Sequence, residues 1–198
     1  MSQKPLLLAS SSPYRKELME RLQLPFSSTR PDIDETPRAG EAAEDLAVRL
    51  ATSKARALAP GFPGHWIIGS DQVAALADGT LISKPGSHEN ARRQLEQSSG
   101  QRVNFFTGLT LLDADSGKLQ TCCEPFTVLF RELSPDEIEA YLRKEAPYDC
   151  AGSFKMEGLG ITLFRELQGG DPNSLVGLPL IALCTMLTAW GRNPLSEP

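Results

Sequence analysis

The stretch Leu-Leu-Leu-Ala-Ser-Ser-Ser-Pro-Tyr-Arg-Lys, residues 6–16, places an apolar run directly before hydroxyl and cationic side chains. The apolar run predicts a short buried strand. Pro13 suits the first position of a helix and Ser12 suits its N-cap, so we expect a helix to begin there. The unpaired backbone N–H groups of that helix start, together with Arg15 and Lys16, would face an anion. The stretch therefore predicts a phosphate site, and a capped helix start without a ligand is the alternative.

Strand-like and helix-like segments alternate along the rest of the chain. That alternation favours an α/β fold. Helices are predicted at 13–23, 42–59, 88–98 and 179–190, and another from a capping box that starts at Ser134. Strands are predicted at 65–69, 72–76, 103–112 and 119–131, with a hairpin turn at 115–117 between the last two. The helix at 179–190 is nearly all apolar, so we expect it to be buried.

The chain has 198 residues with a net charge of −5, and 40% of them are hydrophobic. This composition is typical of one large globular domain or two small lobes. No run of Lys and Arg is longer than the pair at 92–93, so we expect no nucleic-acid partner and a phosphate that belongs to a small molecule. No apolar stretch reaches the roughly 20 residues of a membrane span, and the N-terminus lacks the features of a signal peptide. We therefore expect no membrane partner and a cytoplasmic location.

Cysteine and histidine are too few and too scattered for a zinc site. The four cysteines, Cys122, Cys123, Cys150 and Cys184, have no C-x-x-C spacing and form no cluster with the two histidines. We interpret them as structural thiols, because a buried free cysteine behaves as a small hydrophobic residue.

The acidic segment 32–37 carries three carboxylates, of which Asp34 and Glu35 are the candidate metal ligands. Carboxylate oxygens suit Mg²⁺ or Mn²⁺, and oxygen ligands need no strict sequence spacing. The segment therefore predicts a divalent-cation site, and a solvated turn is the alternative.

Asp71 follows the apolar run 66–69, so we expect it at the carboxyl end of a buried strand, where ligands bind in open α/β sheets. It is the candidate catalytic base, with a strand-end turn as the alternative. Lys54 in the 42–59 helix and Lys84 before a Pro-Gly pair would join Arg15 in binding a triphosphate. This set predicts cleavage of a phosphoanhydride. The chain contains neither a P-loop nor a Rossmann glycine motif that would explain the phosphate site otherwise.

Ten segments in order resemble the Maf family of nucleotide pyrophosphatases: 8–15, 34–35, 54–55, 69–72, 84–85, 95–100, 106–108, 151–154, 157–158 and 176–180. The resemblance implies an ITPase-like long mixed sheet flanked by helices, in a single domain over 1–198 with a cleft between two lobes. It also implies hydrolysis of a nucleoside triphosphate to its monophosphate and pyrophosphate with a divalent cation. In that reaction Asp71 would activate water while Ser10 and Ser12 orient phosphate oxygens. A homodimer is a further expectation from the resemblance.

Tyr14, Gln72 and Glu157 fall where family members vary with their preferred base, and they resemble the branch that prefers 7-methyl-GTP. The ring of Tyr14 would stack on the cationic methylated guanine. Glu157 would accept hydrogen bonds from guanine N1–H and N2–H. Most members of this branch carry Trp at position 14, which offers a better cation–π face. The alternatives are a pyrophosphatase for UTP, dTTP or another modified nucleotide, and a nucleotide-sensing regulator of cell division and septum formation.

Overall fold

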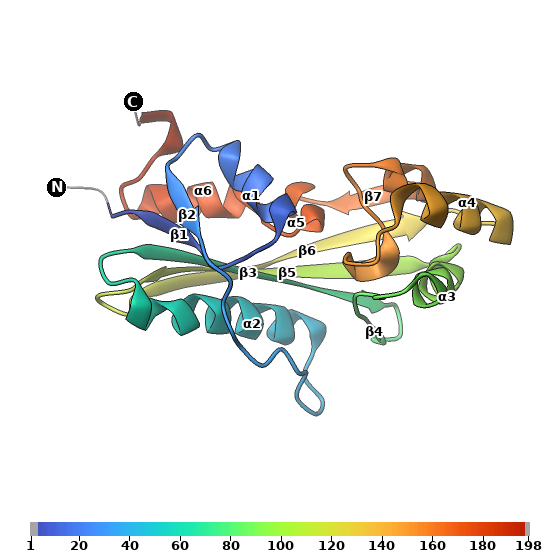
Figure 1. Ribbon diagram of the computed structural model, residues 1–198, viewed down its shortest axis with the longest axis horizontal. Coiled ribbons are helices and arrows are strands. Elements are labelled where there is room, and N and C mark those ends of the chain that lie inside the picture. The colour runs from blue at the N-terminus through green and yellow to red at the C-terminus, as the bar shows by residue number, and fades with distance from the viewer. Residues whose placement is uncertain (1–3, 197–198) are drawn as a thin grey trace.

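The computed structural model describes residues 4–196 and contains one long mixed sheet with helices on both faces (Figure 1). Within these residues the sheet has seven strands in the order β2-β1-β3-β5-β6-β7, and β4 pairs with β3. β1 pairs in parallel with β2 and β3, and the other pairings are antiparallel. The strands are β1 (Leu6–Leu8), β2 (Phe26–Ser28), β3 (Trp66–Leu76), β4 (Leu81–Ile82), β5 (Arg102–Asp113), β6 (Leu119–Phe130) and β7 (Phe164–Gly169).

The helices are α1 (Pro13–Glu20), α2 (Ala43–Leu58), α3 (His88–Ser98), α4 (Pro135–Glu145), α5 (Asn173–Val176) and α6 (Leu180–Ala189). α2 covers one face of the sheet, α1 and α6 cover the other, and α3 and α4 lie toward one end (Figure 1). Each predicted helix is present, and the capping box at Ser134 is formed. The predicted α/β fold, with a long mixed sheet flanked by helices, is confirmed.

The segments predicted as two strands, 65–69 and 72–76, form the single strand β3. β5 pairs antiparallel with β3 along its whole length, including Asp71 opposite Gly108, so the ladder continues where a strand end was expected. The prediction that Asp71 ends its strand is therefore wrong. The parallel neighbour β1 does end there, because its last residue, Leu8, pairs with Ile68. Asp71 consequently lies just beyond the carboxyl end of β1.

Four short elements escaped the sequence analysis. β2 and β4 have two or three residues, β7 lies at the sheet edge, and α5 has only four residues. The expectation that the last helix is wholly buried is also wrong, since the Ile181 side chain on α6 is 61% exposed. None of the helices within residues 4–196 is long and apolar enough to cross a bilayer.

Two glycines on the central strands allow α2 to lie directly on the sheet. A Cβ at Gly69 of β3 would lie 2.1 Å from the carbonyl oxygen of Ala51 on α2. A Cβ at Gly108 of β5 would lie 2.2 Å from the carbonyl oxygen of Ala47, one turn earlier. Both distances are far below van der Waals contact, so only glycine permits this approach. The approach places the next inward-facing residue of α2, Lys54, beside β3.

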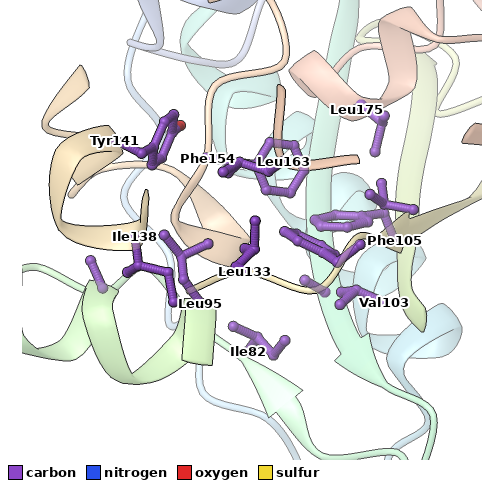
Figure 2. Packing of buried hydrophobic residues seen from close by; sticks show 14 of the residues in the cluster. Ile82, Leu95, Val103, Phe105, Leu133, Ile138, Tyr141, Phe154, Leu163 and Leu175 are labelled. Carbon is purple, nitrogen blue, oxygen red and sulfur yellow. The ribbon is translucent and has the colours of Figure 1, made fainter. Parts of the chain in front are cut away.

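Two apolar clusters stabilise the two ends of the sheet. One gathers aromatic side chains under α3 and α4, with the rings of Phe105 and Phe154 edge to face at 5.4 Å (Figure 2). The other packs α1 and α6 against the sheet through residues such as Leu18 and Leu183. β3 and β5 contribute side chains to both clusters. The two ends therefore share one continuous sheet, while the single two-lobed domain stays a prediction.

Candidate active site

Two adjoining hollows form a cleft beyond the carboxyl end of β1. The first hollow, about 440 Å³, includes Asp71, Gln72 and Glu157, and the second, about 670 Å³, includes the segments 9–15 and 30–35. Several side chains line both hollows, so the hollows are two parts of one cleft. Lys16, which we expected to face the anion with Arg15, lines neither hollow. The cleft contains the other candidate site residues from the sequence: Ser10, Ser12, Tyr14, Arg15, Asp34, Glu35, Lys54, Asp71, Gln72, Lys84 and Glu157.

The start of α1 has the hydroxyl arrangement that the sequence predicted. The Ser12 side chain is the N-cap and accepts a hydrogen bond from the backbone N–H of Arg15 at 3.4 Å. The side chain of Ser10, which is only 6% exposed, accepts from the backbone N–H of Ser12 at 3.1 Å. Because both hydroxyl oxygens act as acceptors within the loop, their O–H groups are available to donate to an anion. The loop and the helix start thus favour a phosphate in the second hollow.

Lys54 lies between two carboxylates where the two hollows meet. Its Nζ is 2.5 Å from Asp71 Oδ1 and 2.7 Å from Glu35 Oε1. Lys54 and Asp71 are buried, whereas Glu35 reaches the cluster from an exposed loop. Burial would raise the pKa of Glu35, but the hydrogen bond and charge of Lys54, with Lys84 and Arg15, together lower it. Glu35 is therefore ionised at neutral pH.

Arg15 is folded toward these carboxylates by a backbone contact. Its Nε donates to the carbonyl oxygen of Gly177 at 2.7 Å, and Ser70 Oγ donates to the same carbonyl at 2.8 Å. Gly177 has φ +111, a left-handed conformation that side chains rarely adopt, and this conformation aims its carbonyl at Arg15. Burial lowers the pKa of Arg15, and the charges of Asp71 and Glu35 oppose that effect. The guanidinium remains charged beside Asp71 and Glu35.

The acidic loop is held against α2 by Arg49, which the sequence analysis missed. Arg49 donates to both Glu41 carboxylate oxygens, at 2.5 and 2.8 Å, and to the carbonyl oxygen of Thr36 at 3.1 Å. This arginine therefore fixes the distance between α2 and the loop that carries Glu35. Unlike the Glu35 side chain, which contacts Lys54, the Asp34 side chain bonds within its own loop: its Oδ1 accepts a hydrogen bond from the backbone N–H of Thr36 at 2.9 Å.

The donor set for a divalent cation is small. No group of three or more His, Cys, Asp and Glu side chains within residues 4–196 is placed to hold a metal ion. Glu35 and Asp71, however, bring two carboxylates to the same ammonium group. Mg²⁺ is typically bound through one or two carboxylates, with water and substrate phosphates completing its octahedron. The residues present fit such a site, with Glu35 placed better than Asp34 to face both hollows.

The first hollow contains the three residues predicted to select the base. Gln72 Nε2 donates to the carbonyl oxygens of Ser174 and Leu175 at 2.7 and 3.1 Å, so its amide nitrogen anchors α5. Burial, followed by the charges of Cys150 and Asp149, raises the pKa of Tyr14 to about 12, and Tyr14 is therefore a neutral phenol. Glu157 completes the lining of this hollow.

Cys150 also lines the first hollow. The sequence analysis interpreted it only as a structural thiol and did not place it in the site. Burial and then Asp149 raise its pKa to about 12, so it is not a thiolate at neutral pH. All four cysteines are free and half-buried. Two charged residues of the cleft, Arg30 and Asp149, had no sequence signal beyond their charge, because neither belongs to a recognisable phosphate or metal pattern.

Three comparisons show which known proteins the chain is similar to. A family model described as "Maf-like protein" matches residues 5–190. A curated protein of Pseudomonas syringae pv. tomato, named 7-methyl-GTP pyrophosphatase, is 60% identical over 186 residues, which cover 94% of this chain and 96% of that protein. The solved structure of a HAM1 protein from Coxiella burnetii overlaps with a TM-score of 0.45 at 17% identity, over 65% of this chain and 73% of that one.

Proposed function

The chain belongs to the Maf family, and we propose that it hydrolyses 7-methyl-GTP to 7-methyl-GMP and pyrophosphate, which would remove the modified nucleotide from the pool. One observation carries the chemistry: a buried lysine joins two carboxylates at the meeting point of a hydroxyl-lined hollow and a Tyr- and Glu-lined hollow. The base would occupy the first hollow and the triphosphate the second. The α-phosphorus then lies next to Asp71.

Asp71 is the residue proposed to accept a proton from the attacking water. The water oxygen forms a bond to the α-phosphorus, and the bond from that phosphorus to the bridging oxygen breaks, so that pyrophosphate leaves. Lys54, Arg15 and Lys84 would stabilise the negative charge that gathers on the phosphoryl oxygens. Ser10 and Ser12 would orient those oxygens by donating their free hydroxyl protons.

The residues proposed to hold Mg²⁺ or Mn²⁺ are Glu35 and Asp71, with Asp34 at the border of the second hollow as a further candidate. When bound, such a cation neutralises phosphate charge and polarises the phosphoryl group. Lys54 would keep Glu35 and Asp71 oriented before substrate arrives, because both carboxylates contact its ammonium group.

Base choice is proposed to rest on Tyr14 and Glu157. A neutral tyrosine ring can stack on the cationic 7-methylguanine, an attraction of about 0.5–2 kcal/mol. Glu157 would accept two hydrogen bonds that a pyrimidine cannot offer in that arrangement. Gln72 would act indirectly, because its amide nitrogen holds α5 against the first hollow. A cytoplasmic location and a homodimer remain predictions from the family resemblance.

The test is pyrophosphate release from 7-methyl-GTP, GTP, UTP, CTP and dTTP with Mg²⁺ or Mn²⁺, compared as kcat/KM. We expect 7-methyl-GTP to be preferred and Asp71→Asn to remove most turnover without unfolding the protein. The double variant Tyr14→Ala, Glu157→Gln should lose the preference, while the exposed control Glu20→Gln should keep it. Activity on UTP or dTTP alone would overturn the assigned base. Tight nucleotide binding without any release would favour the regulator of septum formation.

A further inference from the structure

The charges around the second hollow point to an additional phosphate contact. Four cations line this hollow, and they face four carboxylates: the cations are Arg15, Arg30, Lys54 and Lys84, and the carboxylates are Asp32, Asp34, Glu35 and Asp149. Without Arg30 the lining would carry a net negative charge. A triphosphate carries about four negative charges at neutral pH. Its outermost phosphate therefore needs a cation in the second hollow, at the end farthest from the base.

Arg30 is the arginine of the cleft whose guanidinium is uncommitted. Arg15 donates its Nε to a backbone carbonyl, and Lys54 contacts two carboxylates. Arg30, in contrast, is exposed and makes no hydrogen bond or ion pair with any other residue of the described range 4–196. A guanidinium lining an anion site without a protein partner keeps its whole donor fork for the anion.

The sheet places Arg30 at the far end of the cleft from the base. Three parallel strands, β2, β1 and β3, lie side by side. Arg30 and the serine loop follow the carboxyl ends of β2 and β1, and Asp71 lies within β3, three residues beyond the partner of Leu8. Neighbouring strands are about 4.8 Å apart, so β2 and β3 lie about 10 Å apart on the two sides of β1. In the proposed reaction, the attacking water and an extended triphosphate would occupy that span. Arg30 also lines only the second hollow, away from Gln72 and Glu157.

We propose that Arg30 binds the terminal phosphate of the substrate and retains contact with the pyrophosphate leaving group. This inference rests on the proposed function, because it takes the triphosphate to lie in the second hollow. Its planar fork matches two oxygens of a phosphate. The contact exists equally in the bound substrate and in the transition state at the α-phosphorus, and therefore strengthens binding more than turnover.

The direct test is titration of the full chain with pyrophosphate and Mg²⁺ by calorimetry, using Arg30→Gln and the matched control Arg165→Gln. Arg165 lies on the edge strand β7, is exposed, and lines neither hollow. We expect Arg30→Gln to weaken pyrophosphate binding about tenfold and Arg165→Gln to leave it unchanged. Arg30→Lys should recover part of the loss. Equal pyrophosphate affinity in the two glutamine variants would overturn the proposal.

Kinetics separate this contact from a structural role and from the proposed function. Arg30→Gln should raise KM for 7-methyl-GTP about tenfold with kcat within about twofold, and should leave inhibition by 7-methyl-GMP unchanged. Weaker inhibition by the monophosphate as well would indicate a disturbed cleft and would contradict a contact at the terminal phosphate. If the wild-type protein released no pyrophosphate from any triphosphate, the proposed function would fail, and the calorimetric comparison would still decide whether Arg30 binds pyrophosphate.

Discussion

Replacing Lys54 by methionine tests the central cluster most directly, because it removes the charge and keeps most of the volume. Lys54 Nζ contacts Asp71 and Glu35 at 2.5 and 2.7 Å, and the two buried members of this cluster, Lys54 and Asp71, are 7% and 8% exposed. Removing one partner of a buried ion pair typically destabilises a protein by about 3–5 kcal/mol. Glu35 is mostly exposed and adds little, and Asp71 lines the first hollow instead of lying in the closed core. We therefore expect Lys54→Met to lower the free energy of unfolding by about 2–3 kcal/mol at pH 7.

A double-mutant cycle shows whether the loss comes from the uncompensated carboxylate. Asp71→Asn alone should destabilise by about 1 kcal/mol, because Lys54 keeps Glu35 as a partner. Adding Asp71→Asn to Lys54→Met should recover about 2 kcal/mol, since no buried charge then remains unpaired. The exposed control Lys144→Met should lower stability by less than about 1 kcal/mol.

Urea unfolding followed by tryptophan fluorescence measures these values. Trp66 and Trp190 lie edge to face at 5.1 Å, so their environment changes when the sheet and the C-terminal segment separate. Pyrophosphate release should be lost in Lys54→Met and should not return in the double variant, even as stability does. A stability of Lys54→Met within about 0.5 kcal/mol of the wild type would refute the reasoning from the buried pair. Simple additivity of the two substitutions would refute it as well.

Four further substitutions test the cleft and its supports. Gly69→Ala should destabilise the protein by about 3 kcal/mol or more in thermal unfolding and should reduce activity, because the added Cβ would force α2 away from β3. Wild-type stability in this variant would show that α2 does not lie on β3 as described. Arg49 lowers the pKa of Glu41 to about 2, so this ion pair should stabilise the protein above pH 4.5 and be lost as the pH falls toward 2. Arg49→Gln should remove that part of the pH dependence, and an unchanged stability profile would contradict the role of the pair. Glu35→Gln should raise the Mg²⁺ concentration for half-maximal activity more than tenfold and Asp34→Asn less than threefold, and the reverse order would reassign the ligand.

Most of the helices and the residues expected to bind phosphate or metal could be found from local sequence. The residues proposed to select the base, Tyr14, Gln72 and Glu157, came from the family resemblance, and Arg30 and Arg49 were missed. Capping residues such as Ser12 and Ser134 mark helix starts because their side chains satisfy nearby backbone N–H groups. The short strands β2 and β4 carry too few residues for a period of two to be recognised. The sequence analysis predicted two strands with a break between residues 69 and 72, and this prediction is wrong because the structure has one continuous strand there. Antiparallel pairing with the distant strand β5 overrides the local turn preference of Ser and Asp.

By itself, the sequence determined that this protein has an α/β fold with a serine-capped helix start, an acidic loop and separate cationic segments, because caps and apolar runs act over a few residues. Only the tertiary structure decided how these parts meet. Lys54, Asp71 and Glu35 join in one ion-pair cluster because two glycines let α2 lie on the sheet and Arg49 fixes the acidic loop. Arg30 enters the cleft because β2 pairs in parallel with β1. Such contacts join residues far apart in the chain, and chain-wide packing decides which of them form.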